Sequence, residues 1–461
     1  METSQDRAAT TTQVINADEV VRGVAIARRN FKLGVANGVL GGLMDPLSGV
    51  FVITLFLTTL NGPQFLVGLL PAMWSWGILL PQMIVAGKVR GKRRVMPWYK
   101  GAAVIRVTGM VGMTVSAAVV LLNRDLVLLI FFVSYLVYAV GCGVSGIPFI
   151  EVVGKIVPDH RKGSFFGYRQ FGSGAMSIFA SAVAGIVIAE HLGLKFPYNF
   201  AAMFGFATIV GVIVFWLWTR VDEPDLVAVK APETASVFKL GLRALRSDRD
   251  YRLFTIVRLL ATFAGIAGPF YLVFVTKVMR VPLDAMGIYM MASTGVSLFG
   301  GLLWAPVANR TPRHKLIAIS TGLQFANAIC SVLVIALAGN LSAEIAPFAA
   351  APVFLMGGLA SSAAVMFNDT TLLSIAPDGE RPTYFGFLNT LAGTASFVLP
   401  LGGLMLEAWG YLPLFALATT LAAAAFLAAL SLSVSSARLR RPSFIPRLTN
   451  AISRRRADKT P

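Results

Sequence analysis

Residues Leu33–Leu57 read LGVANGVLGGLMDPLSGVFVITLFL, an apolar run with a single acid in its interior, in the pair Asp45-Pro46. A helical run of this length crosses a hydrocarbon core of about 30 Å. A carboxylate near the middle of a bilayer is costly unless it is neutralised, paired or hydrated, so Asp45 is interpreted as part of a substrate or proton pathway. Pro46 removes a backbone hydrogen bond and therefore predicts a broken helix.

Eleven further apolar runs of roughly 20 residues follow along the chain. They are Phe65–Val85, Trp98–Leu122, Leu126–Ile147, Phe171–Ile188, Tyr198–Trp218, Leu253–Val275, Met286–Val307, Leu316–Leu337, Ile345–Phe367, Phe385–Leu404 and Leu412–Leu432. Of the 461 residues 56% are apolar and only 13% are charged, and the mean hydropathy is +0.72. A soluble protein carries about 25% charged residues. The sequence therefore predicts an all-α integral membrane protein with twelve transmembrane helices.

Lysine and arginine are concentrated on one side of the membrane. Twelve spans put both termini on the same face, and that face, with the helix ends that touch it, holds 36 of the 40 basic residues. The other face holds only Arg124, Lys195, Lys277 and Arg280. Because basic loops stay in the cytoplasm, this distribution predicts a multi-pass protein of the cytoplasmic (inner) membrane with both termini cytoplasmic. It also explains the net charge of +18 without a nucleic-acid partner.

The sequence repeats itself at an offset of 219 to 220 residues. Ile156–Asp159 matches Ile375–Asp378, and Asn30–Leu33 matches Asp250–Leu253. Several matches in the same order at one spacing indicate two six-helix halves. The predicted organisation is a cytoplasmic N-terminal tail (1–32), an N-terminal half (33–218), a central cytoplasmic loop (219–250), a C-terminal half (251–434) and a basic cytoplasmic tail (435–461).

Two of these polar segments have alternative interpretations. Residues 237–245 alternate basic and apolar side chains at helical spacing, which suits a helix on the membrane surface, and a solvated linker explains them equally well. The eight Lys and Arg residues of the tail 435–461 suit contact with anionic lipid, and solvation is again the simpler alternative.

Two six-helix halves joined by a central loop resemble the major facilitator superfamily, and the resemblance extends from about Arg29 to Val434. The basic turn VAGKVRGKRR, residues 85–94, is similar to the family's turn between helices 2 and 3, but the family's Asp is missing. The copy in the second half, residues 308–315, has Asn309 at that place. The resemblance implies alternating access between the halves. The candidates for a cytoplasmic gate are Arg90, Arg93, Arg94, Glu151, Arg169, Arg310, Arg313 and Asp369.

Asp45 belongs to a stripe of small and polar residues on one face of the first span, which includes Asn37, Gly38 and Gly41. A helix-packing seam is the simpler interpretation of such a stripe, but packing alone does not require a carboxylate. Asp45 lies about 18 Å beyond Leu33 along the helix, near the bilayer midplane. We therefore predict proton or substrate coupling through Asp45, with structural pairing as the alternative.

Arginines within or near the spans are the next candidates. Arg106 lies about 9 Å deeper than Lys100, and could pair with Asp45 or an anionic substrate. Arg169 and Arg258 lie nearer to helix ends, where such side chains commonly snorkel to the interface. The candidates for lining the cavity are Asn37, Trp74, Trp76, Gln82, Arg258 and Asn389. Aromatic packing against lipid or a neighbouring helix is the alternative for the tryptophans.

Other classes of function find no motif in the sequence. It contains no GxxxxGK[ST] phosphate loop, metal-ligand cluster or nucleophile triad, so we expect no enzyme activity, cofactor or metal. The leading hypothesis is a secondary active transporter of a small solute, working by alternating access, with proton-coupled efflux through Asp45 as its mechanism. The expected partners are a small-molecule solute, protons and the lipid bilayer, and the expected state is a monomer. The alternative is a non-transporting membrane assembly factor, or a factor that handles pigment or lipid.

Overall fold

The structure is a computed structural model that describes residues 17–89, 92–225, 234–377 and 381–432. Twelve helices in these ranges are long and apolar enough to cross a membrane, which confirms the predicted all-α fold. The N-terminal half contains α1 (Ala17–Ser48) with α2 (Val50–Thr59), α3 (Gln64–Val89), α4 (Met96–Ala118), α5 (Arg124–Ile156), α6 (Asp159–Ile188) and α7 (Tyr198–Thr219).

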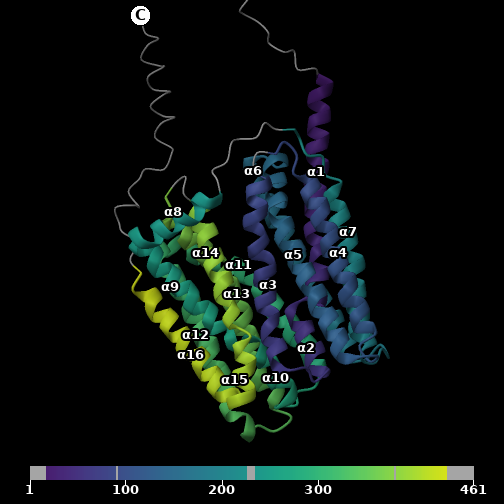
Figure 1. Cartoon of the computed structure of the whole chain (residues 1–461), viewed down its shortest axis with the longest axis vertical. Helices are drawn as coiled ribbons and strands as arrows, with labels where there is room; N and C mark the ends of the chain where they lie inside the picture. Colours follow the sequence, from purple (N-terminus) through teal and green to yellow (C-terminus); the bar gives the residue numbers. More distant parts are fainter. Residues whose placement is uncertain (1–16, 90–91, 226–233, 378–380, 433–461) are drawn as a thin grey trace, which may run out of the picture.

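The C-terminal half repeats this order (Figure 1). It contains α9 (Arg249–Ala264) with η1 (Gly265–Ala267) and α10 (Gly268–Lys277), α11 (Asp284–Arg310), α12 (Arg313–Leu337) with η2 (Ala338–Asn340), α13 (Ala346–Ile375), α14 (Arg381–Ala395) with η3 (Ser396–Val398) and α15 (Leu401–Trp409), and α16 (Tyr411–Leu430). Three spans of this half are therefore built from more than one helix, as is the first span of the other half.

The helix of the first span begins well before the apolar run that predicted it. α1 starts at Ala17 rather than at Leu33, and residues 22–29 are mostly exposed. Good helix formers such as alanine, glutamate and arginine extend the helix past the hydrocarbon core. Part of the predicted N-terminal tail is thus a continuation of the first span. Residues 1–16 and the predicted basic tail 435–461 lie outside the described residues.

The central loop contains a helix, α8 (Thr234–Ser247), that packs on the C-terminal half. Its Gly241 lies directly against Phe387 of α14, and the Phe238 ring lies 5.4 Å from the ring of Phe387. Ala244 is buried in the same apolar cluster. Leu242, Ala244 and Leu245 thus belong to the cluster through which α8 packs on α14 and α9.

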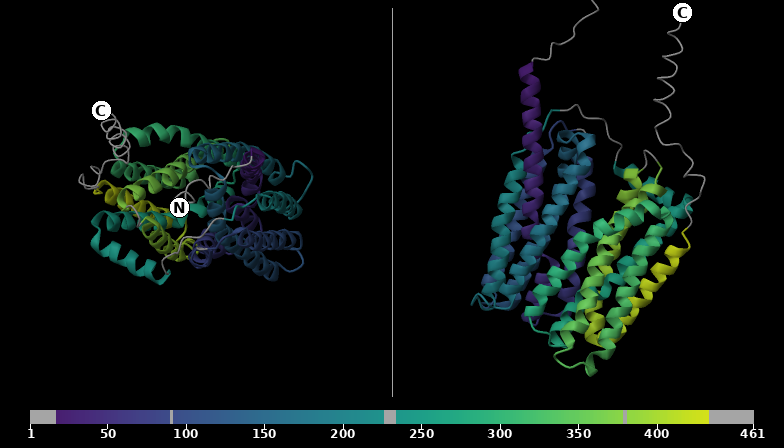
Figure 2. Two further views of the ribbon diagram at one scale, coloured as in Figure 1. Left: turned by 90° about the horizontal axis from the view of Figure 1, so that it is seen from above. Right: turned by 180° about the vertical axis from the view of Figure 1, so that it is seen from behind.

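We call the face from which α1 begins the terminal face, and the other the opposite face. The helices of the two halves lie side by side toward the opposite face and diverge toward the terminal face (Figure 2). Near the opposite face, His191 lies 2.8 Å from Asp284, and the backbone N–H of Gln64 donates to Glu407 at 2.9 Å. Lys277 donates to the side chain of Asn61. The contacts named here join the halves on one side of the membrane only.

A close backbone approach between the halves also lies near the opposite face. A Cβ atom built on Gly287 of α11 would lie 2.4 Å from the Cα atom of Gly185 in α6, so neither position can accept a side chain without movement. Nearer the middle of the membrane, the rings of Trp76 and Phe397 stack at 3.9 Å. This pattern belongs to a conformation that is closed at the opposite face.

Candidate functional site

The break predicted in the first span is present. α1 ends at Ser48, Gly49 is extended (φ −79°, ψ 169°), and α2 begins at Val50. Pro46 has no N–H to donate to the carbonyl of Gly42, one turn earlier. The hydroxyl of Ser177 in α6 donates to that carbonyl instead, at 3.0 Å. A neighbouring helix thus satisfies the backbone group that the proline leaves free.

Asp45 lies at this break and faces open space. It lines two cavities, of about 290 Å³ and about 420 Å³, and its side chain is exposed to them. Within the described ranges its carboxylate makes no hydrogen bond or ion pair. The charge of Arg106, which lines the same cavity, attracts the carboxylate, and cavity water, a proton or a solute can supply the direct contacts that it lacks.

The smaller cavity lies within the N-terminal half, and two arginines, Arg106 and Arg169, line it. Arg106 and Asp45 both line it, as the sequence suggested, but they form no direct ion pair. The guanidinium of Arg106 lies 3.9 Å from the centroid of the Phe215 ring, and its Nε is buried without a hydrogen-bond partner. A cation over an aromatic face is stabilised without a carboxylate. Its positive charge therefore remains available to the cavity.

Arg169 and Asn37 form a second polar group in this cavity. Arg169 donates to the carbonyl of Gly34 and to Oδ1 of Asn37 at 2.9 Å. Asn37, which is 5% exposed, donates in turn to the carbonyl of Val214 at 2.7 Å. These bonds join α6 to α1 and α1 to α7. Arg169, predicted for the gate, thus lines the cavity and ties helices together.

The cavity between the halves is walled by small polar residues. It is lined by Ser173, Ser177, Ser293, Thr294, Ser297 and Ser361 together with Asp45, Gln170, Gly174, Leu298, Gly357 and Gly358. Its walls come from α1, α6, α11 and α13. The serines and threonine were not singled out in the sequence, because single hydroxyls are common in transmembrane helices and carry no spacing signal.

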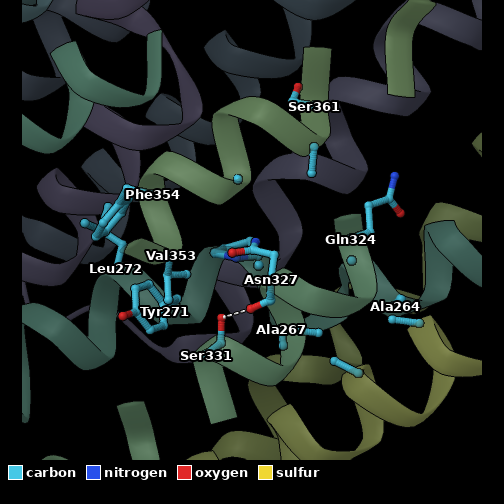
Figure 3. A pocket seen from close by; sticks show the side chains of 18 of the residues that line it. Ala264, Ala267, Tyr271, Leu272, Gln324, Asn327, Ser331, Val353, Phe354 and Ser361 are labelled. Carbon is cyan, nitrogen blue, oxygen red and sulfur yellow. Dashed lines mark hydrogen bonds between the residues drawn. The ribbon is translucent and has the colours of Figure 1, made fainter. Parts of the chain in front are cut away.

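A third cavity, of about 660 Å³, lies mainly in the C-terminal half, and we call it the C-half cavity. Figure 3 shows Gln324, Asn327 and Ser331, which α12 contributes, together with Tyr271 and Phe354. It shares Ser293, Gly357 and Ser361 with the cavity at Asp45, so the two adjoin. The three cavities therefore form one connected series across the two halves.

The other cavity candidates lie apart from these linings. Trp74 packs on Tyr135 and Tyr138 of its own half. Trp76 packs on Phe397 across the halves, and its Nε1 is buried without a partner. Gln82 of α3 faces Gly146 of α5.

Arg258 and Asn389 also lie away from the three cavities. Arg258 has a buried Nε without a partner and interacts electrostatically with Asp369. Asn389 is exposed on α14 and lines none of the three cavities.

Most gate candidates lie at the terminal face. Glu151, Arg310 and Asp369 are exposed near the ends of their helices, and Arg93 is exposed in the turn between α3 and α4. Arg94 is also exposed and forms a bidentate ion pair with Asp225, at 2.7 Å and 2.9 Å. That hydrogen-bonded carboxylate raises the pKa of Arg94 above its ordinary value. Arg90 lies outside the described residues, and Arg313 is described only as the first residue of α12.

A short acidic segment binds this basic region, and we call Asp222, Glu223 and Asp225 the acidic strap. Glu223 accepts hydrogen bonds from the backbone N–H groups of Val95 and Met96, at the start of α4, and from Lys155 at 2.7 Å. Asp222 lies 3.6 Å from Arg29. The sequence analysis missed the strap because its partners lie more than 60 residues away along the chain.

Metal binding finds no support in the part of the chain that the structure describes. No group of three or more His, Cys, Asp or Glu side chains there could hold a metal ion. The polar groups of the cavities are instead hydroxyls, amides, two arginines and one carboxylate. This set suits binding of an organic solute and a proton.

Solved transporters share the fold. A bacterial homologue of the iron transporter ferroportin, in an inward-facing state, matches with a TM-score of 0.66 at 12% identity, covering 88% of this chain and 98% of the other. A D-xylose–proton symporter matches with a TM-score of 0.65 at 16% identity, covering 89% and 98%. The nucleoside transporter NupG matches with a TM-score of 0.67 at 14% identity, covering 87% and 100%.

Comparison of sequences gives the family. No curated protein sequence matches the chain. The profile described as Major Facilitator Superfamily matches residues 35–400, which include most of the residues that line the three cavities, the breaks in the first and seventh spans and most of both halves. This protein therefore belongs to the major facilitator superfamily.

Proposed function

We propose that this protein is a proton-coupled secondary active transporter that exports a small solute, with Asp45 as the proton carrier. Its membership of the major facilitator superfamily supports a transporter rather than an enzyme. The observation that supports the coupling is the carboxylate of Asp45, which lies at the break of the first span, faces two cavities and forms no hydrogen bond or ion pair with the described residues.

Alternating access supplies the conformational change. The halves are in contact near the opposite face, through pairs such as His191 with Asp284, and diverge at the terminal face. Rocking of one half against the other would close the terminal face and open the opposite one. A solute entering from the terminal face reaches Asp45 through the serine-lined cavity. Protonation of Asp45 removes the charge that makes a closed, dehydrated site costly.

Export is the direction we favour, because a single acid lies on the first span with aromatic side chains nearby. We place the protein in the cytoplasmic membrane as a monomer, with the terminal face toward the cytoplasm, since 36 of 40 basic residues belong to that face. A cysteine at Ser342 should then react with an impermeant maleimide in intact cells, and a cysteine at Lys92 should not. Labelling of Lys92→Cys under these conditions would reverse the orientation.

The variant Asp45→Asn tests the coupling. The amide resembles a protonated carboxyl in shape and charge, so solute uptake driven by a pH gradient in proteoliposomes should fall to background. Counterflow exchange of solute needs no net proton movement and should survive at least in part. Asp45→Glu should retain some coupling with a shifted pH optimum. A broad solute screen with the unmodified protein supplies the solute for these assays.

Two outcomes contradict the proposal in different ways. If Asp45→Asn still concentrates solute in response to a pH gradient, the carboxylate has a structural role and the coupling lies elsewhere. If the unmodified protein moves no solute in the screen, the non-transporting alternative, an assembly factor or a pigment- or lipid-handling factor, is favoured.

A further inference from the structure

We propose that the C-half cavity binds an uncharged, ring-shaped part of the solute that carries hydroxyl or amide groups. This inference rests on the proposed transport function and names the chemical class of solute. The volume of the cavity, about 660 Å³, falls within the usual range of about 300–1,000 Å³ for small-molecule sites.

The first observation is the absence of charge. None of the residues that line the C-half cavity is acidic or basic, although the cavity adjoins the one that contains Asp45. Moving an ionised group into such surroundings without a counter-charge is far more costly than moving a hydroxyl that finds a hydrogen-bond partner. The lining therefore selects against a charge on the part of the solute that it surrounds.

The internal repeat strengthens this point. At an offset of 220 residues, Arg106 of α4 corresponds to Ala326 of α12, next to Asn327. The N-terminal half thus places a guanidinium beside its cavity where the C-terminal half has an uncharged alanine. The two related cavities have different chemistry, and the larger one is the neutral one.

Unused hydrogen-bonding groups indicate what the neutral part must offer. Oδ1 of Asn327 and Oγ1 of Thr54 are buried without a hydrogen-bond partner, and both residues line the cavity. An unsatisfied buried polar atom is destabilising by about 1–3 kcal/mol. This acceptor has almost no accessible surface as the cavity stands, so a hydroxyl or amide of the solute would reach it after a small movement of the Asn327 side chain. Gln324 adds a further amide to the same wall (Figure 3).

Opposite these amides is a firmly held aromatic wall. The ring of Phe354 stacks on Tyr289 at 4.6 Å and lies 5.4 Å from the ring of Tyr271. The tyrosine hydroxyls donate to backbone carbonyls, that of Tyr271 to Ala350 at 3.2 Å and that of Tyr289 to Pro347 at 2.6 Å. Fixed aromatic rings bind the apolar face of a ring while amides bind its polar edge.

The cavity also depends on contact between the halves. Val50, Phe51 and Thr54 of α2 close one side, and the ring of Phe51 lies 6.0 Å from the ring of Phe354. Movement of α2 with the N-terminal half would take this wall away. A ligand that contacts both walls therefore favours the conformation in which they meet, which is the requirement for coupling binding to alternating access.

Equilibrium binding to the full-length protein in nanodiscs tests the inference, with two probes of matched size. Radiolabelled phenyl β-D-glucoside is neutral, whereas phenyl β-D-glucuronide carries a carboxylate on the same ring. We expect saturable binding of the glucoside, at least tenfold tighter than binding of the glucuronide. Each loss of a hydrogen bond in Asn327→Leu or Gln324→Leu should weaken glucoside binding about tenfold. Asn340→Leu, at an exposed site on η2, should leave it unchanged.

Several results would overturn the inference. These are tighter binding of the glucuronide, no saturable binding of the glucoside, or equal affinities in Asn327→Leu, Gln324→Leu and Asn340→Leu, with size-exclusion profiles confirming that the variants are folded. Binding requires no proton movement, so Asp45→Asn should still bind the glucoside. Retained proton-driven flux in Asp45→Asn with intact glucoside binding would therefore count against the coupling mechanism and not against this site.

Discussion

Glu223 is an acid that contacts the chain just after a basic turn whose own Asp, expected from the family pattern, is missing. The basic turn at residues 85–94 lacks the family's Asp, yet its far end is not left without an acid. The side chain of Glu223 is 3% exposed, caps the start of α4 and pairs with Lys155, whose side chain is 13% exposed. An acid near a helix N-terminus is favoured by the helix dipole as well as by its hydrogen bonds.

We predict that Glu223→Gln is strongly destabilising. The amide can still accept one backbone hydrogen bond, but Lys155 is left as a nearly buried cation without a counter-charge. Loss of one partner from a buried ion pair costs about 3 kcal/mol or more. The melting temperature in nanodiscs should fall clearly, and Lys155→Met in the same chain should restore part of the loss. Glu344→Gln, at an exposed position, is the control. Equal melting temperatures for the two single variants would show that the pair contributes nothing.

The sequence was informative about some residues of the site and silent about others. Asp45 was predictable because an acid inside an apolar run is costly wherever it lies. Arg106 was placed in the same cavity by its depth alone. The strap was not predictable, since Glu223 and Val95 are 128 residues apart and only the fold brings them together. From the sequence alone, Asn327 could not be distinguished from an amide that ties two helices together.

At the scale of helices, the break in the first span depends on a contact between two of them. Gly42 of α1 packs so closely on α6 that a Cβ atom there would lie 2.0 Å from the carbonyl oxygen of Ser173. This approach brings the hydroxyl of Ser177 to the Gly42 carbonyl that Pro46 cannot satisfy. The proline, the glycine and the serine therefore act as a unit that holds Asp45 at the cavity.

A double-mutant cycle can measure this unit. Ser177→Ala should destabilise the protein by about 1–3 kcal/mol, because the carbonyl of Gly42 loses its donor. In Pro46→Ala the new N–H can form the ordinary helical bond to the same carbonyl. The double variant should therefore be less destabilised than Ser177→Ala alone. Thermal unfolding of all four proteins in nanodiscs gives the coupling, and strictly additive effects would mean that the serine does not serve this carbonyl.

The break in the seventh span was not predicted from the sequence. This break, η1, falls at Gly265–Ala267, and Gly265 is the position that the repeat relates to Asp45. Pro269 follows the break and favours a new helix start, but it lies at the beginning of α10 and not inside an apolar helix. Gly265, Gly268 and Pro269 are all poor helix formers, so the sequence is compatible with a break here but does not fix where the helix ends.

At the scale of the molecule, Gly185 and Gly287 form the tightest approach between the halves near the opposite face. Because both partners are backbone, nothing flexible can yield to an added methyl group. A side chain added at this point would push the halves apart at the opposite face. It would therefore favour the conformation that is closed at the terminal face.

We therefore predict that Gly287→Ala shifts the balance of conformations. Spin labels at Lys88 and Asn309, near the terminal ends of α3 and α11, should report shorter distances in this variant than in the unmodified protein. Gly301→Ala is a matched control in the same helix, since a Cβ atom there meets nothing within 4 Å. Identical distance distributions for the two variants would remove Gly287 from the closure of the opposite face.

The predicted fold of twelve spans in two halves was confirmed, because apolar length and the internal repeat are properties of the sequence itself. The conformation could not be read in the same way. Two conformations of a transporter place the same helices in the same order and differ by only a few kcal/mol, through contacts between residues far apart in the chain. Nothing in the sequence indicates that Gly185 and Gly287 lie against one another.

The acidic strap also sets the length of the linker between the two halves. It fastens the chain to the N-terminal half through Asp225, and the chain belongs to α8, docked on the C-terminal half, from Thr234 onward. Nine residue steps join these two anchor points. A fully extended chain of that length spans roughly 30 Å, and this covalent limit holds in every conformation. Releasing Asp225 and Glu223 from their partners would lengthen this linker. The strap therefore limits how far the two halves can separate at the terminal face.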